Sequence, residues 1–194
     1  MEDRVYQSGG DRGAAAKPAG ALTFSHALPA PPPRWFAESS DPVRSLTDAV
    51  DFLDEVSEPG IGLLYDFYHL WDETDIVIDT ERFASRIFGV QYNDWRESPR
   101  CAANRLRPGD GIMDIPALLG ALNRGGFDGW YDLEIFSDDG RWGTDLPDSL
   151  WRLPHDELIG RAQSGLLRAW RSATGTGMVD RAFKRRRHRS SAMI

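Results

Sequence analysis

The chain has 194 residues, of which 41% are hydrophobic and 27% are charged. This length and composition suit one globular domain with a sizeable core and exclude disorder along the whole chain. Thirty acidic residues against 23 basic ones give a net charge of −7. Six of the bases lie from Arg181 onward, which leaves 17 bases against 30 acids, or −13, for the rest. We therefore expect the main body to repel nucleic acid.

The chain carries no sign of secretion or membrane insertion. Its single cysteine, Cys101, excludes an intrachain disulfide and a cysteine-rich zinc site, as is typical of a reducing compartment. No apolar run approaches the ~20 residues that cross a membrane, and no signal-peptide core follows the charged start. We expect a cytoplasmic protein without a membrane partner.

Both ends differ in composition from the middle. Residues 1–40 are rich in proline, glycine and alanine, which favours a disordered tail. Residues 176–194 contain the basic run Lys184–Arg189, which fits either a nucleic-acid or anionic-lipid contact or a solvated tail. We favour a basic disordered tail, because no aromatic residues interleave with the bases. Residues 41–175 remain as the folded part.

Helical and strand patterns alternate through the folded part. In chain order we predict a helix between Asp41-Pro42 and Pro59-Gly60, a strand over 61–65, a helix over 80–86, a strand over 87–92, a helix over 115–124, a strand over 130–135 and a helix over 154–172. This alternation predicts a parallel sheet with helical crossovers. Three parallel strands cannot close a barrel, so open sheet edges and self-association are expected.

Polar residues follow each predicted strand. They are Asp66 and His69 after the first strand, Gln91, Asn93 and Asp94 at the second, and Asp132 and Glu134 at the third. Because ligands of parallel α/β folds bind at the carboxyl ends of strands, these side chains could hold a hard divalent cation beside a general base. The alternative, that Asp66 and His69 only cap the next segment, stays open.

Three segments resemble a known family. They are PGIGLLYDFYHLW over Pro59–Trp71, NRLRPGDGIMD over Asn104–Asp114, and FDGWYDLEI over Phe127–Ile135. They resemble the strand-six, strand-seven and strand-eight segments of xylose isomerase-like TIM barrels. This sugar phosphate isomerase/epimerase group includes ketose 3-epimerases and inosose dehydratases and is related in fold to endonuclease IV. The resemblance covers about residues 45–172 and implies an α/β fold, a partial (β/α)8 TIM barrel with about its last three β/α units.

The resemblance also implies a chemistry. The family holds one divalent metal, often manganese, magnesium, cobalt or zinc, through Glu, Asp, His and a second Glu. By position, Asp66 and Glu134 would be metal ligands, and Gln91 stands where the family has His. His69 and Arg105 match positions that hydrogen-bond substrate oxygens, and a Glu carboxylate would move a proton through an enediolate. Glu134, His69 and Arg105 are therefore the expected catalytic residues.

The chain departs from the family at two ligand positions and lacks the earlier strands. Gln91 replaces the imidazole, and the region before Asp66 that would hold the first Glu, Leu28–Trp35, contains no matching residue. We expect a truncated isomerase or epimerase acting on a sugar or sugar phosphate. The alternative is a non-catalytic half-barrel remnant that binds a sugar or a protein partner. A DNA-repair endonuclease is disfavoured, because the four histidines are scattered.

Two of the seven tryptophans, Trp71 and Trp95, follow strand ends and could line a sugar pocket. Two others, Trp151 and Trp170, are expected to pack against the last helix. Asp138-Asp139-Gly140 resembles a calcium loop in composition only.

Overall fold

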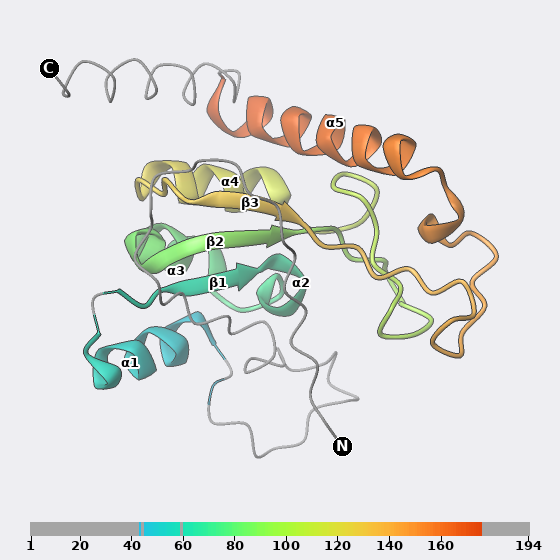
Figure 1. Cartoon of the computed structure of the whole chain (residues 1–194). Coiled ribbons are helices and arrows are strands. Elements are labelled where there is room, and N and C mark those ends of the chain that lie inside the picture. Colours follow the sequence, from blue (N-terminus) through green and yellow to red (C-terminus); the bar gives the residue numbers. More distant parts are fainter. Residues whose placement is uncertain (1–42, 44, 59, 176–194) are drawn as a thin grey trace, which may run out of the picture.

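The computed structural model describes residues 43, 45–58 and 60–175 (Figure 1). The two predicted tails lie outside these described residues. The elements are α1 (Leu46–Val56), β1 (Leu63–Asp66), α2 (Phe67–Leu70), α3 (Ile76–Phe83), β2 (Ile87–Tyr92), α4 (Ile115–Arg124), β3 (Trp130–Leu133) and α5 (His155–Thr174), with short 3-10 turns at Ala84–Arg86 and Leu150–Arg152. The predicted alternation of helices and strands is confirmed.

The three strands form one parallel sheet in the order β1-β2-β3. Tyr65 pairs with Val90, which pairs with Tyr131, and Asp66 pairs with Gln91 one step further along. The sheet does not close on itself, and in Figure 1 the three arrowheads point the same way, toward the long loops. The fold is a partial TIM barrel with an unclosed sheet, as the sequence predicted.

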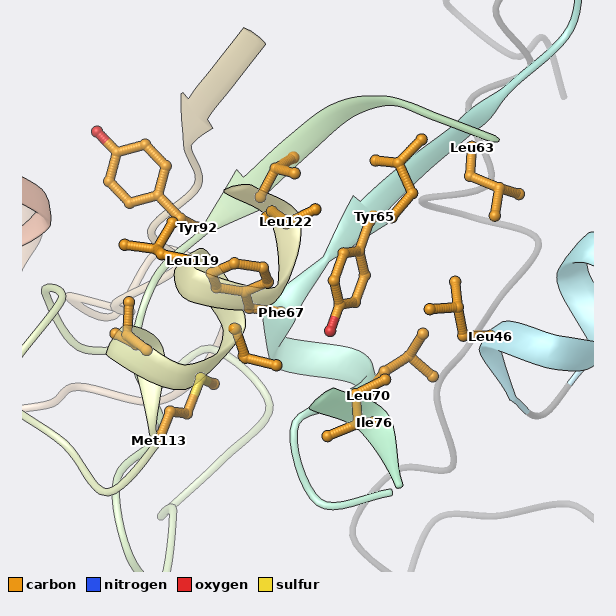
Figure 2. Close-up of a cluster of buried hydrophobic side chains, with 14 of the residues drawn as sticks. Leu46, Leu63, Tyr65, Phe67, Leu70, Ile76, Tyr92, Met113, Leu119 and Leu122 are labelled. Atoms are coloured by element: carbon orange, nitrogen blue, oxygen red, sulfur yellow. The ribbon is translucent and has the colours of Figure 1, made fainter. Parts of the chain in front are cut away.

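The two faces of the sheet differ in burial because strand side chains alternate. On one face Leu63, Tyr65 and Val90 are buried in a core shared with the helices, part of which is drawn in Figure 2. The other face carries the half-buried Leu64 and the exposed Trp130 and Asp132. Among the described residues, helices cover only the first face of the sheet. In a closed TIM barrel the helices lie outside, and the second face would line the interior.

Local signals set the ends of α1 and α4. The Ser45 hydroxyl accepts the backbone N–H of Asp48 at 2.9 Å and caps α1. The predicted cap at Asp41-Pro42 lies outside the described residues. The Asp114 carboxylate caps α4 by accepting the N–H of Ala117 at 3.0 Å. α4 therefore occupies the predicted range.

Tertiary contacts explain where the elements differ from the predicted ranges. α3 begins at Ile76 rather than at residue 80, because Ile76 and Thr80 share its buried face. The Thr80 hydroxyl donates a hydrogen bond to the Tyr65 hydroxyl at 3.2 Å, which gives this buried polar group a partner. The four-residue helix α2 was not predicted, since one turn is too short to show a periodicity. Within the part of the chain described, no helix has both the length and the apolar character to cross a membrane.

Candidate active site

The carboxyl ends of the strands bring together residues that are far apart in the sequence. Asp66 ends β1, Gln91 lies near the end of β2, and Glu134 follows β3. Arg105, from the loop between β2 and α4, lies between the two carboxylates. Four of the five site residues that the family resemblance implied therefore form one connected cluster, and the fifth, His69, lies beside Asp66.

Arg105 is the centre of this cluster. Its Nη1 donates to Asp66 Oδ2 at 2.9 Å and also to Glu134 Oε2, while only 6% of the side chain is exposed. The guanidinium carbon lies 4.1 Å from the centre of the Tyr68 ring and 4.6 Å from that of Phe136. Two carboxylates and two ring contacts thus fix the orientation of the guanidinium.

The backbone explains how Arg105 reaches this position. Its N–H donates to the carbonyl of Phe136 at 2.8 Å, so the segment runs alongside the chain that follows β3. The next residue, Leu106, exchanges two backbone hydrogen bonds with Asp94, which follows β2. The loop is therefore held between the continuations of two strands, and Arg105 faces the strand ends.

Asp66 has two roles in the structure. Its Oδ1 accepts the backbone N–H of Tyr68 at 2.9 Å, which caps α2, and the side-chain amide of Asn93 at 3.2 Å. Its Oδ2 faces Arg105 and lies 3.4 Å from His69 Nε2. The capping interpretation that the spacing left open therefore applies to one oxygen, while the other belongs to the polar cluster.

Glu134 has the most perturbed acid–base behaviour in the cluster. Burial, together with the neighbouring Asp66 carboxylate, raises the pKa of Glu134 to about 7, although Arg105 opposes the rise. Its Oε1 accepts a hydrogen bond from Gln91 Nε2 at 3.1 Å. A carboxyl group with a pKa near neutrality can both accept and return a proton under physiological conditions.

The donor atoms of this cluster fit a hard divalent cation. Asp66 and Glu134 supply carboxylates, while Gln91 Oε1 and Asn93 Oδ1 are buried carbonyl oxygens without a hydrogen-bond partner in the structure. Buried acceptors without partners are costly, and oxygen ligands suit magnesium or manganese. Among the described residues no three His, Cys, Asp or Glu side chains form a metal-binding group, so the amide oxygens are needed to complete a set.

Asp94, one of the polar residues expected at the strand ends, has a structural role. Its carboxylate accepts four backbone N–H groups, from Trp95, Gly109, Gly111 and Met113, at 2.8–3.1 Å. Burial raises the pKa of Asp94, and these four N–H donors only partly oppose that rise. The oxygens of Asp94 therefore hold the turn that precedes α4.

Sequence reasoning missed the aromatic partners of Arg105. Tyr68 and Phe136 lie inside or just beyond the recognised segments, but a contact between a ring and a cation leaves no spacing signal. Burial raises the pKa of Tyr68 to about 12, with Arg105 opposing the rise, so this phenol stays protonated. Trp95 is 7% exposed and contacts the rings of Tyr68 and Trp71, which makes Trp95 part of the core rather than of an open sugar-stacking surface.

A separate groove of about 470 Å³ lies between the turn after Arg105 and α5. Its lining is charged and of mixed sign, and includes Arg107, Asp110, Glu157 and Arg161. Arg107 pairs with Asp110 and Arg161 with Glu157. None of the sequence-predicted site residues lines this groove, so we place the candidate active site at the strand ends.

Comparisons with known proteins identify the family. The model of the xylose isomerase-like TIM barrel family matches residues 32–161. A comparison with curated proteins found no match. Among solved structures, protein SMc04130 from Sinorhizobium meliloti 1021 is 27% identical with a TM-score of 0.53, and the match covers 62% of this chain and 42% of that one.

Two further structures show the same fold. The IOLI protein with a bound zinc atom is 21% identical with a TM-score of 0.54, over 67% of this chain and 45% of that one. An L-ribulose 3-epimerase is 23% identical with a TM-score of 0.53, over 69% of this chain and 46% of that one. The chain thus spans less than half the length of each of these three structures. It belongs to the xylose isomerase-like TIM barrel family.

Proposed function

We propose that the strand-end site binds a sugar or sugar phosphate and, with a divalent metal, transfers a proton in an isomerase or epimerase reaction. The observation that carries this proposal is the polar cluster at the strand ends, in which the Glu134 carboxylate accepts hydrogen bonds from Arg105 and Gln91 and shares Arg105 with Asp66. Family membership supports a reaction of this class, and the L-ribulose 3-epimerase with the same fold gives an example.

The metal would be held by Asp66, Glu134 and Gln91. When bound, it would polarise a hydroxy-ketone and acidify the neighbouring C–H bond. The residues of the chain then have separate roles. The Glu134 carboxylate accepts the proton from carbon, which leaves an enediolate, and returns it to the adjacent carbon while the hydroxyl proton passes to the former carbonyl oxygen, which completes an isomerisation. Epimerisation instead requires a second acid that protonates the opposite face of the same carbon. Arg105 and His69 donate hydrogen bonds to oxygens on which negative charge develops.

A non-catalytic sugar-binding or partner-binding remnant is the second candidate. Gln91 supports it, because an amide oxygen is a weaker ligand than imidazole for a transition metal. The absence of a matching Glu within Leu28–Trp35 supports it as well. The two candidates differ in the metal affinity that they require, since a remnant needs none.

Manganese binding by calorimetry on the full chain tests the proposal, with turnover measured as proton–deuterium exchange into a panel of ketoses. We expect micromolar manganese binding and exchange in the wild type. Glu134→Gln should abolish both, and Asp66→Asn should weaken manganese affinity about tenfold or more. Glu55→Gln, an exposed change on α1, is the matched control. Unchanged exchange in Glu134→Gln would sink the assignment, and a wild type without manganese binding would favour the remnant.

Gln91→His provides a second arm of the same experiment. An imidazole at this strand position should strengthen binding, and more for zinc than for manganese, because nitrogen ligands suit zinc better than amide oxygens do. Equal affinities in the variant and the wild type would mean that this end of β2 does not contact the metal.

A further inference from the structure

Trp142 is exposed over 61% of its surface, although it belongs to an ordered loop beside the candidate site. The loop, residues 137–149, follows β3 at the carboxyl ends of the strands. The indole lies 5.3 Å from the ring of Phe136 and 4.9 Å from that of Trp151, measured between ring centres. Phe136 in turn lies against the guanidinium of Arg105. A continuous series of ring contacts therefore leads from the polar cluster to a solvent-exposed indole.

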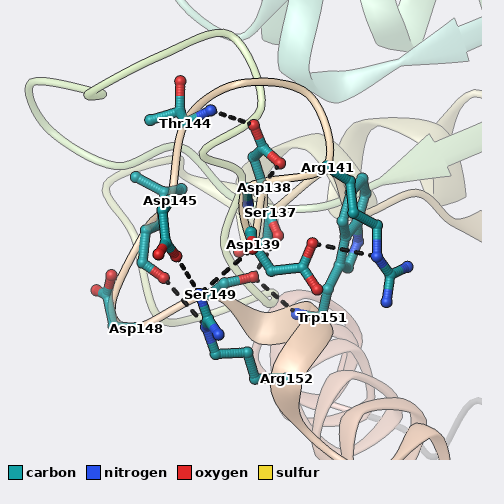
Figure 3. Close-up of polar contacts among 12 residues, drawn as sticks. Ser137, Asp138, Asp139, Arg141, Thr144, Asp145, Asp148, Ser149, Trp151 and Arg152 are labelled. Atoms are coloured by element: carbon teal, nitrogen blue, oxygen red, sulfur yellow. Dashed lines mark hydrogen bonds and ion pairs between the residues drawn. The ribbon is translucent and has the colours of Figure 1, made fainter.

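Hydrogen bonds fix the backbone of the loop that carries this indole, and Figure 3 draws those made by Asp138 and Ser149. The Asp138 carboxylate accepts the N–H groups of Gly140, Trp142 and Thr144 at 3.1, 2.9 and 2.7 Å. The Ser149 hydroxyl donates to the carbonyl of Ser137 and ties the two ends of the loop together. Burial acts to raise the pKa of Asp138, but the N–H donors more than offset this and lower it. The loop therefore presents Trp142 in a fixed position.

The charges around the loop do not suit a phosphate group. Arg141 lies 3.3 Å from Asp139, and Arg152 pairs with Asp145. Asp148 forms ion pairs with two arginines from the loop between β2 and α4, Arg96 at 3.0 Å and Arg100 at 2.7 Å. In the described part of this region each of these guanidinium groups already has a carboxylate partner. Because none of these described arginines is left to neutralise an anion, the surroundings of Trp142 favour an uncharged ligand over a phosphate.

We propose that Trp142, together with Phe136, forms a stacking surface for the C–H face of an unphosphorylated sugar whose oxygens are bound at the strand ends. The inference rests on the proposed function and adds to it a specificity-determining residue and a substrate class. Sugar C–H groups carry a small positive charge and meet the negative face of an aromatic ring favourably. The polar cluster around Arg105 offers donors to the oxygens, so the two parts of the site match the two kinds of surface on a sugar.

Fluorine NMR of the full-length chain measures whether a sugar contacts Trp142. Protein labelled with 5-fluorotryptophan is titrated with D-fructose, D-allulose, L-ribulose and D-fructose 6-phosphate, and fluorine NMR is recorded. The Trp142 signal is assigned by its loss in Trp142→Phe. We expect this signal to move with at least one neutral ketose, while the signal of the buried Trp170 does not. We also expect the sugar phosphate to bind more weakly than the neutral ketose.

Variants give the size of the effect. Trp142→Ala should weaken ketose binding about two- to tenfold, the range of one aromatic contact, and Trp142→Phe should restore part of the loss. Ile159→Ala, an exposed apolar residue on α5, is the matched control and should leave affinity unchanged. Thermal unfolding of Trp142→Ala should match the wild type, which separates a binding role from a structural one.

The outcomes distinguish this inference from the proposed function. Ketose binding that leaves the Trp142 signal unmoved and is unchanged in Trp142→Ala would overturn the stacking surface and leave the proposed function standing. Tighter binding of the sugar phosphate would overturn the preference for a neutral sugar. A wild type that binds no member of the panel would overturn the proposed function and this inference with it.

Discussion

The guanidinium of Arg105 holds the candidate site together. Arg105 Nη1 donates to carboxylates from the ends of two different strands, and its guanidinium contacts the rings of Tyr68 and Phe136. Removing one partner of such a buried group leaves the others uncompensated, so Asp66, Glu134 and Arg105 act as a unit. Their spacing in the sequence does not reveal this unit, because Arg105 lies 39 residues from Asp66 and 29 from Glu134.

A second perturbed acid, Glu73, predicts how stability depends on pH. Burial raises the pKa of Glu73 from 4.5 to about 7, and nearby carboxylates add to the rise, namely Asp79 on α3, Asp48 on α1 and the adjacent Asp72. The backbone N–H of Leu46 lies 3.4 Å from Glu73 Oε2 and opposes it. Between pH 4.5 and about pH 7, the folded state therefore binds more protons than the unfolded state. The contribution of Glu73 to stability is fully present below pH 4.5 and is lost as the pH rises through about 7.

Glu73→Gln should remove this pH dependence. At pH 8 the variant should be more stable than the wild type by on the order of 1 kcal/mol, because Glu73 is only half-buried and solvent screens its charge. Urea unfolding at pH 5 and pH 8 measures the difference, with Glu55→Gln as the exposed control. An equal change in stability at both pH values would contradict the assignment to Glu73.

At the scale of elements, the α5 helix carries two glycines in opposite environments. A Cβ on Gly165 would lie 2.0 Å from the carbonyl oxygen of Pro108, so the helix and the turn after Arg105 approach closely only because no side chain intervenes. A Cβ on Gly160 would meet nothing within 4 Å. One glycine is required by packing, and the other only weakens the helix.

Alanine substitutions should therefore have opposite signs on one helix. Gly165→Ala should destabilise the fold by about 1–3 kcal/mol through overpacking, whereas Gly160→Ala should stabilise it by about 0.5–1 kcal/mol through helix propensity. Thermal unfolding of the two variants measures both effects. Stabilisation of similar size in both would mean that the close contact with Pro108 does not form.

At the scale of the whole molecule, the three described strands form an open sheet. Among the described residues β1 and β3 each pair with β2 alone, and Leu64 and Trp130 lie on the face without helices. Open edges next to apolar side chains favour pairing with another chain. We therefore propose that the chain self-associates through these edges, in line with the expectation from its sequence.

Light scattering of the 21.8 kDa chain tests the proposal. We expect a mass above that of the monomer that rises with concentration. Leu64→Lys should reduce the association, because a charge on the open face opposes edge pairing. Ile78→Lys, an exposed change on α3, should not affect it. A monomer at every concentration would rule out self-association through the sheet.

The elements with strong local signals could be predicted from the sequence. β2 and α4 have the predicted bounds, because the apolar residues from Ile87 to Val90 mark the strand, and Asp114 and the glycines at 125 and 126 mark the helix ends. β3 ends at Leu133, two residues before the prediction, and β1 begins at Leu63, two residues after it, because apolar patterns do not fix where pairing stops. The roles assigned to Asp66, His69, Gln91, Arg105 and Glu134 remain predictions.

The sequence by itself therefore determined the α/β class, the parallel alternation, the family and the strand ends at which polar side chains gather. Each of these follows from residues that are neighbours along the chain, since periodicity, caps and short motifs act over a few positions. Only the tertiary structure decided that Arg105 joins Asp66 to Glu134, that Asp94 holds a turn, and that Trp142 projects beside the site. These outcomes depend on contacts between residues far apart in sequence, which burial and hydrogen-bond partners create only once the chain has folded.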